Sequence, residues 1–185
     1  MKFSKTNING VIVIEPNVIK DQRGYFLESF NKKEFKKVIG KVVFVQENES
    51  KSSKGVLRGL HFQKPPFTQA KLMRCIEGKV LDIALDIRKG SPTYGVYHSV
   101  VLSKENKKQL FVPRGFAHGF LVLSDTAVFS YKVDNFYAPE HDAGIRWNDK
   151  ELNIQWGLEE SDVLVSEKDI QLPFFSEFDS PFKLQ

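Results

Sequence analysis

The sequence predicts an all-β fold, either a jelly-roll or cupin-type β-barrel or a double-sheet sandwich, with a few short peripheral helices. Short runs of strand-forming residues recur along the chain, with turn residues between them. One run, residues 80–87, alternates two sets of side chains with a period of two. The 16 phenylalanines, spread over so many short strands, favour a packed sandwich or barrel.

Nine segments are expected to form strands. In chain order they are residues 11–14, 42–46, 56–63, 71–76, 80–87, 97–102, 109–112, 119–123 and 128–133. The alternation in residues 80–87 predicts a half-buried strand. Glu77 and Gly78, just before it, predict a tight hairpin between the fourth and fifth of these strands.

One helix is expected between Asn31 and Gly40. Asn31 is a suitable N-cap, and Gly40 is a suitable C-terminal stop. Phe35, Val38 and Ile39 are expected to share the buried face of this helix. A shorter helical pattern lies at residues 166–170. No repeat, low-complexity tract or linker interrupts the 185 residues, so a single cupin-like domain over residues 1–185 is expected.

The composition argues against several classes of partner. The net charge of +4 is small and spread along the chain, so it disfavours nucleic-acid binding but suits a small anionic ligand. The only cysteine, Cys75, excludes an intrachain disulfide and favours a reducing compartment. No secretory signal follows Met1, and no apolar run approaches the length of a membrane span. We therefore expect a cytoplasmic protein without a membrane partner.

Two of the four histidines are candidates for chemistry. His98 falls on an alternating strand and His141 in a polar loop, so both are expected to be structural or exposed. His61 follows Arg58 in the segment 55–63. His118 closes residues 113–118, a Pro-x-Gly-x-x-His turn that leads into an apolar strand and resembles the second motif of cupin barrels.

A metal site is disfavoured at the first cupin motif. Gln63 stands where metal-binding cupins have their second histidine, and no glutamate follows at the expected ligand position. Lys71 and Arg74 lie in that stretch instead, and cations repel a divalent metal. An imidazole, an arginine and a lysine in a barrel interior suggest acid–base chemistry on an anionic ligand, with no metal and no cofactor.

Seven blocks of the sequence resemble one family, the dTDP-4-dehydrorhamnose 3,5-epimerases of deoxysugar synthesis. They are residues 21–28, 45–63, 69–75, 86–95, 113–120, 137–147 and 164–169. The resemblance implies inversion of C3 and C5 of dTDP-4-dehydro-6-deoxy-D-glucose, which gives dTDP-4-dehydro-L-rhamnose. That product is the precursor of dTDP-L-rhamnose for cell-surface polysaccharide such as lipopolysaccharide.

The resemblance also implies four catalytic roles. His61 is the base that removes protons from C3 and C5, and Asp169 orients it. Lys71 stabilises the oxygen of the enolate, where negative charge develops. Tyr131 returns a proton from the opposite face of the sugar. Without the resemblance, His61 and Tyr131 are ordinary core residues and Asp169 is a polar turn residue.

Substrate-binding residues are implied in the same way. They are Arg23, Phe26, Glu28, Gln46, Glu47, Asn48, Arg58, Lys71, His118, Tyr137, Asp142 and Lys168, with Tyr137 stacking on the thymine. Arginine and lysine suit a diphosphate. The segment that carries Arg23, Phe26 and Glu28 crosses to the partner subunit in this family. A homodimer with shared active sites is therefore expected.

Strand geometry raises one difficulty. Arg58 and His61 are three positions apart, so a regular strand points them to opposite faces. Gly59 between them can host a β-bulge, which re-aims side chains near active sites. The sequence therefore predicts irregular pairing near Gly59.

Three alternative functions remain open. A relative of the same class inverts only one carbon or uses another nucleotide sugar, because the same base and acid serve either reaction. A non-catalytic sugar-binding cupin predicts loss of the base or acid, whereas His61, Lys71, Tyr131 and Asp169 are all present. A metal-dependent cupin oxygenase or isomerase predicts one tightly held metal per chain.

Overall fold

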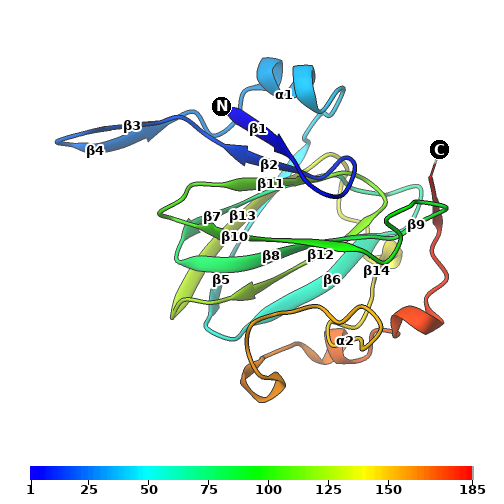
Figure 1. Cartoon of the computed structure of the whole chain (residues 1–185). Coiled ribbons are helices and arrows are strands. Elements are labelled where there is room, and N and C mark those ends of the chain that lie inside the picture. The colour runs from blue at the N-terminus through cyan, green and yellow to red at the C-terminus, as the bar shows by residue number, and fades with distance from the viewer. Residues whose placement is uncertain (185) are drawn as a thin grey trace.

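Two antiparallel β-sheets face each other in the computed structural model, which describes residues 1–184 (Figure 1). The six-stranded sheet has the order β1 (Lys2–Lys5), β2 (Ile12–Glu15), β11 (Gln109–Val112), β7 (Lys71–Glu77), β13 (Thr126–Val133) and β5 (Gln46–Ser53). The five-stranded sheet has the order β10 (Tyr97–Ser103), β8 (Lys79–Asp86), β12 (Phe116–Val122), β6 (Leu57–Gln63) and β14 (Asp142–Gly144). The predicted all-β double-sheet architecture is confirmed.

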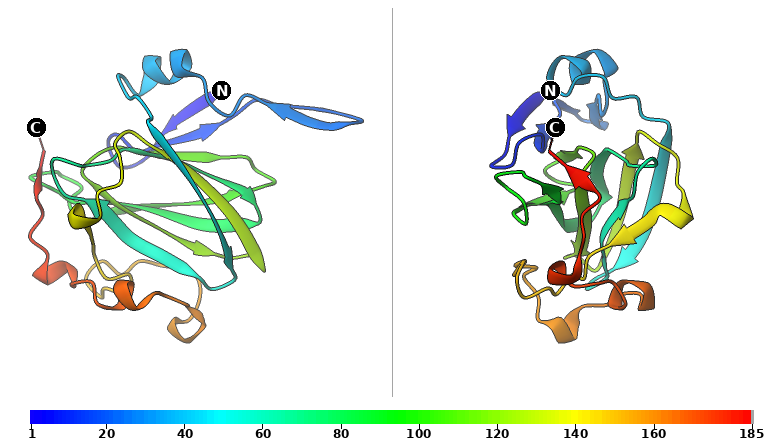
Figure 2. Two further views of the ribbon diagram at one scale, coloured as in Figure 1. Left: turned by 180° about the vertical axis from the view of Figure 1, so that it is seen from behind. Right: turned by 90° about the vertical axis from the view of Figure 1, so that its right-hand side faces the viewer.

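Smaller elements surround the two sheets. β3 (Val18–Asp21) and β4 (Gly24–Leu27) form a hairpin that projects from the body, as the left view of Figure 2 shows. β9 (Arg88–Lys89) pairs in parallel with β15 (Phe182–Lys183). The helices are α1 (Lys32–Val38) and α2 (Glu167–Ile170), with 3-10 turns at Pro139–His141, Glu160–Asp162 and Phe175–Glu177. No helix within residues 1–184 has the length and apolarity needed to cross a membrane.

Three apolar clusters hold the layers together. The first fills the space between the sheets and includes Met73, Phe120 and Phe129. The second lies on the outer face of the five-stranded sheet. The chain that follows β14, called the C-terminal segment below, covers this face with Trp147 and Trp156. The third lies on the outer face of the six-stranded sheet, under α1. Each sheet therefore buries side chains on both faces, the six-stranded sheet only in part on its outer face, and each burial removes apolar surface from water.

The sequence prediction of α1 is correct except at one residue. The side chain of Asn31 accepts hydrogen bonds from the backbone N–H groups of Lys33 and Glu34, as an N-cap does. Gly40 follows the helix with a φ of +90°, and Phe35 is buried. Val38 was expected on the same face but is 44% exposed, because the short helix turns it away from the sheet. The second predicted helix is also present, as α2 with Ser166 as its N-cap.

Strand β5 departs from the sequence prediction. Residues 42–45 lie outside any strand, and the strand begins at Gln46, where the prediction had it end. It then runs through eight residues that are all polar. Its inward side chains need no apolar character, because Ser50 lines a cavity rather than the packed core. A hydrophobic pattern therefore does not mark this strand.

The predicted hairpin at Glu77 and Gly78 is wrong. β7 belongs to the six-stranded sheet and β8 to the five-stranded sheet, so the chain crosses between layers at Gly78. Gly78 has a φ of +76°, and a Cβ atom there would lie 2.0 Å from the carbonyl oxygen of Thr126. The turn residues thus mark a sharp change of direction correctly, but they do not say which strand pairs with which.

The prediction that β8 is half-buried is also wrong, since both of its faces are covered. Ile83 and Leu85 pack under the C-terminal segment. Val80 and Ala84 pack between the sheets. The period of two is real, but here it separates two buried faces instead of core from solvent.

The irregular pairing predicted near Gly59 is confirmed. His118 on β12 pairs with His61 on β6, and Phe120 pairs with Arg58. Between these two pairs the chain advances by two residues on β12 but by three on β6, so β6 contains one extra residue, which is a β-bulge. The extra residue brings Arg58 and His61 to the same side of the sheet, where both line one cavity.

We expect Gly59→Ala to lower the free energy of unfolding by about 2–4 kcal/mol. Gly59 has a φ of +134°, and a Cβ atom would lie 2.5 Å from the Cα of Gly119. Urea denaturation measures the loss. Gly24→Ala is the matched control, since Gly24 has a φ of +130° but nothing within 4 Å of the added atom. An equal loss in both variants would show that the contact with Gly119 contributes nothing.

Candidate active site

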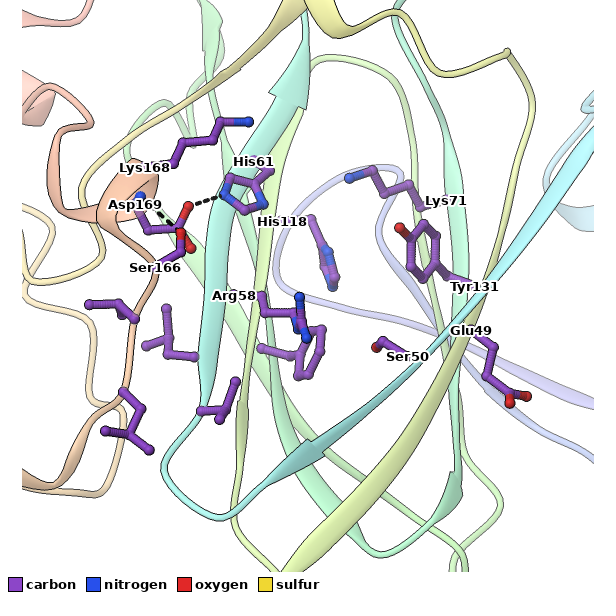
Figure 3. A pocket seen from close by; sticks show the side chains of 15 residues that line it. Glu49, Ser50, Arg58, His61, Lys71, His118, Tyr131, Ser166, Lys168 and Asp169 are labelled. Atoms are coloured by element: carbon purple, nitrogen blue, oxygen red, sulfur yellow. Dashed lines mark hydrogen bonds and ion pairs between the residues drawn. The ribbon is translucent and has the colours of Figure 1, made fainter.

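A cavity of about 440 Å³ opens between the two sheets (Figure 3). Both sheets contribute to its walls, and the segment 164–169 closes one side. A second cavity of about 310 Å³ adjoins it, since His61, Lys71 and Tyr131 line both. The three residues to which the resemblance assigns proton transfer and enolate stabilisation therefore lie at the junction of the two spaces.

His61 forms a hydrogen-bonded pair with Asp169 of α2. The distance from His61 Nε2 to Asp169 Oδ1 is 2.6 Å. Because a carboxylate only accepts, Nε2 carries the hydrogen and Nδ1 keeps its lone pair. Figure 3 shows the ring held between Asp169 and the open part of the cavity. The arrangement leaves His61 ready to take a proton at Nδ1.

Asp169 stays ionised in a buried position. Burial alone would raise its pKa, but the hydrogen bond with His61 and the backbone N–H of Gly59 outweigh burial and lower the pKa below its ordinary value. Ser166 accepts a hydrogen bond from the backbone N–H of Asp169 and fixes the first turn of α2. The bulge at Gly59 and the cap of α2 together place the carboxylate.

Lys71 is one of three cationic side chains that line the cavity, together with Arg58 and Lys168. It is half-buried at the start of β7, and its partial removal from water lowers its pKa to about 8, against the opposing charges of Asp142 and Asp82. Within residues 1–184 its ammonium group forms no ion pair. An unpaired ammonium group at this position is available to an anionic or polarised oxygen of a ligand.

Tyr131 faces the cavity from the wall opposite His61. It lies on β13 in the six-stranded sheet, whereas His61 lies on β6 in the five-stranded sheet (Figure 3). Burial raises the pKa of Tyr131, so its hydroxyl group is protonated at neutral pH. A proton acceptor and a proton donor thus stand on opposite sides of one space, with Lys71 beside Tyr131.

Polar side chains line the adjoining cavity. Gln46 accepts a hydrogen bond from the backbone N–H of Tyr137 at 3.2 Å and donates one to Asn48 at 2.9 Å. Asp142 accepts hydrogen bonds from the hydroxyl group of Tyr137 and from Lys168. The ion pair with Asp142 raises the pKa of Lys168. This wall offers amides, charges and one aromatic ring, which suits a nucleotide base and its polar groups.

Arg58 lies in the main cavity and is steadied by Ser52. Its guanidinium group donates to Ser52 Oγ at 3.3 Å and 3.2 Å. The fork has five N–H groups, so donors remain for an anionic ligand. Sequence reasoning did not single out Ser52, because a serine in a polar stretch carries no distinguishing signal.

Not every predicted binding residue reaches this cavity. Arg23, Phe26 and Glu28 belong to the projecting hairpin and the segment after it, and Phe26 is 69% exposed. Glu47 lies on the outward face of β5, where its carboxylate accepts hydrogen bonds from Ser130 and Lys132. Parity explains Glu47, because Gln46 and Asn48 on either side of it point inward.

The residues of the first cupin motif have other tasks than metal binding. Gln63 is buried, donates to the carbonyl groups of Phe67 and Phe136, and accepts from the backbone N–H of Ala138. Arg74 was expected near Lys71, but it lines a separate small cavity beside Tyr25. In the part of the chain that the structure covers, no group of three or more His, Cys, Asp or Glu side chains is placed to hold a metal ion.

Known proteins resemble this chain over nearly its whole length. The family described as dTDP-4-dehydrorhamnose 3,5-epimerase matches residues 5–177. A protein of that name from Shigella flexneri is 55% identical, over 92% of this chain and 93% of its own length. The solved structure of the Legionella pneumophila dTDP-6-deoxy-D-glucose-3,5-epimerase, in complex with dTDP-4-keto-L-rhamnose, is 44% identical with a TM-score of 0.95 and covers 100% of this chain and 98% of that one.

A more distant structural neighbour has a narrower activity. The 3'-monoepimerase from Streptomyces bikiniensis, solved with dTDP-quinovose, is 32% identical. Its TM-score is 0.87, and the match covers 92% of this chain and 86% of the other. One fold therefore serves inversion at one carbon as well as at two.

Proposed function

Because the chain belongs to the dTDP-4-dehydrorhamnose 3,5-epimerase family, we propose that its cavity inverts C3 and C5 of dTDP-4-dehydro-6-deoxy-D-glucose. The product is dTDP-4-dehydro-L-rhamnose, the precursor of dTDP-L-rhamnose. One observation supports the proposal above the others. His61 and Tyr131 face each other across one cavity from different sheets, and Lys71 lines the same cavity. Inversion of a carbon needs a base and an acid on opposite faces.

The proposed reaction proceeds through an enolate. His61 Nδ1 takes the proton from the carbon next to the ketone, and the electron pair of the C–H bond moves onto the C4 oxygen. The ammonium group of Lys71 stabilises that oxygen. Tyr131 then donates its phenolic proton to the same carbon from the opposite face. The cycle repeats at the second carbon after the two side chains have exchanged protons with solvent.

The nucleotide occupies the adjoining cavity in this proposal. Tyr137 stacks on the thymine, Gln46 and Asn48 contact it, and Arg58 binds the diphosphate. Asp142 completes the polar wall of the adjoining cavity and pairs with Lys168, whereas His118 lines the main cavity, where the sugar is proposed to bind. The Legionella structure supports this ligand class, since that relative was solved with a dTDP-sugar.

The projecting hairpin reaches a partner subunit in the proposed assembly. Tyr25 and Phe26 are large and more than half exposed on β4, which leaves apolar surface uncovered in the isolated chain. We assign Arg23, Phe26 and Glu28 to the partner's active site in a homodimer with shared sites. The single, buried Cys75 supports a reducing compartment, and we propose the cytoplasm as the location of this homodimer.

Deuterium exchange tests the function. The protein is incubated with dTDP-4-dehydro-6-deoxy-D-glucose in deuterated water, and C3 and C5 are followed by NMR. Label at both positions is the expected result. Label at one position indicates a mono-epimerase, the alternative that the Streptomyces neighbour favours. Binding without exchange at either position contradicts the proposal and indicates a non-catalytic sugar-binding protein.

Tyr131→Phe is expected to separate proton removal from inversion. The variant keeps the base, so His61 still exchanges the sugar proton with deuterium on its own face. Completed inversion falls roughly 100-fold, because the acid on the other face is gone. Product formation and isotope exchange are measured in the same sample. Equal loss of both would remove Tyr131 from the role of acid.

A further inference from the structure

A second histidine–aspartate pair lies next to the first. His118 on β12 stands directly opposite His61 on β6, and its Nε2 is 2.5 Å from Asp82 Oδ1. Asp82 comes from β8, the other neighbour of β12, and has no exposed surface. The cavity is thus lined by two imidazoles, each held by a buried carboxylate.

The pairing fixes the hydrogen on the ring of His118. A carboxylate accepts and does not donate, so Nε2 carries the hydrogen that bonds to Asp82. Burial lowers the pKa of His118, against the opposing effect of Asp82, so the ring is neutral at neutral pH. Nδ1 is then a lone-pair acceptor. Among residues 1–184 it has no hydrogen-bond partner, and His118 borders the cavity.

Packing alone does not account for Asp82. It sits between Val80 and Ala84 on a face that belongs to the apolar core, and its Oδ2 has no partner in the described chain. A buried carboxylate in such surroundings is costly. Asp86, on the same face of the same strand, has both oxygens bonded, by Arg88 and the hydroxyl groups that follow it.

We propose that Asp82 is a positioning residue, which takes the Nε2 hydrogen of His118 and so leaves Nδ1 to accept a hydrogen bond from a sugar hydroxyl group. This inference rests on the proposed function for the kind of ligand, a nucleotide 4-keto-sugar. The ammonium group of Lys71 only donates, and Nδ1 of His118 only accepts. A ketone oxygen therefore fits Lys71 and is rejected by His118, whereas a hydroxyl group fits His118. The two side chains together orient the sugar ring.

Nitrogen-15 NMR of histidine-labelled protein tests the first half of the proposal. The free wild-type protein at pH 7.5 is expected to show His118 with its hydrogen on Nε2. Adding dTDP-rhamnose is expected to shift the Nδ1 signal, and adding dTDP, which has no hexose, is not. A hydrogen on Nδ1, a doubly protonated ring, or equal responses to both ligands would overturn the proposal. This arm needs no variant, so it decides even if Asp82 cannot be replaced.

Calorimetric binding of the same two ligands tests the second half. Asp82→Asn is expected to weaken dTDP-rhamnose about tenfold and to leave dTDP within about twofold. Asp86→Asn is the matched control, a second buried carboxylate of β8 that lies outside both cavities. It is expected to lower stability while keeping the ratio of the two affinities. An unchanged ratio in Asp82→Asn, or the same change in Asp86→Asn, contradicts the proposal.

Neither the NMR experiment nor the calorimetric experiment requires the protein to catalyse epimerisation. If the wild-type protein exchanges no deuterium at C3 or C5, the proposed epimerase function fails. The tautomer of His118 and the ratio of the affinities still judge the role of Asp82. The two failures are therefore distinguishable.

Discussion

His61→Ala is expected to abolish isotope exchange at both C3 and C5, with a loss of roughly 10³-fold or more in kcat. The imidazole is the group that Asp169 orients, at 2.6 Å, and its free Nδ1 faces the space where the sugar is proposed to bind. Removing it leaves Asp169 on the wrong side of the missing ring to act directly. Exchange followed by NMR and turnover followed by product formation measure the effect independently.

His98→Ala is the matched control for this variant. His98 lies on β10, contacts Asn7 and lines neither cavity. Its replacement is expected to leave kcat and KM unchanged. Near-normal exchange in His61→Ala would place the base elsewhere. A similar loss in both variants would point to a general effect on the fold.

Lys71→Met is expected to lower kcat/KM by roughly 10²- to 10³-fold. Methionine keeps most of the length and apolar stem of lysine but removes the charge. Negative charge develops on the ketone oxygen only as the carbon–hydrogen bond breaks, so the loss falls on the transition state more than on binding. Kinetics of the variant, with dTDP affinity as the reference for binding, check the expectation. A pure rise in KM would contradict it.

The pH dependence follows from the same residue. Burial lowers the pKa of Lys71 to about 8, so the side chain is cationic below that pH and neutral above it. The wild-type kcat/KM is therefore expected to fall as the pH rises through about 8. Lys71→Arg retains a charge that does not titrate there, and its profile is expected to stay flat on the alkaline side. An alkaline limb of the same midpoint in Lys71→Arg would assign the titration to another group.

Much of the fold follows from local patterns in the sequence. β11 was predicted residue for residue, and seven of the other eight expected strands lie within a few residues of their predicted bounds, because β-branched and aromatic residues are frequent there. The remaining strands β1, β3, β4, β9, β14 and β15 were not predicted. The bounds of β5 were not predicted, because its inward side chains face a cavity and its outward ones face solvent, so neither face is apolar. The passage of the chain from one sheet to the other at Gly78 was not predicted for another reason. Local turn geometry is the same whether the next strand pairs with the last one or joins the opposite sheet.

In the candidate site too, local patterns predicted some features, whereas contacts that depend on the whole fold were missed. Strand parity, combined with the site roles that the resemblance implies for Arg58 and His61, located the irregularity at Gly59 that brings the two side chains together. The contacts of Asp82 with His118 and of Ser52 with Arg58 were not foreseen, because they join strands whose pairing is decided by the whole fold. Parity also places Glu47 outside the cavity, where the resemblance had implied a ligand contact.

The C-terminal segment both covers the five-stranded sheet and supplies the partner of the proposed base. Its tryptophans cover the outer face of the five-stranded sheet, and its short helix α2 delivers Asp169 to His61. The orientation of the base therefore depends on the docking of this segment against the rest of the fold. We expect that His61 lacks its orienting carboxylate until α2 is docked. Local unfolding of this segment is therefore expected to lower the activity while the two sheets are still packed against each other.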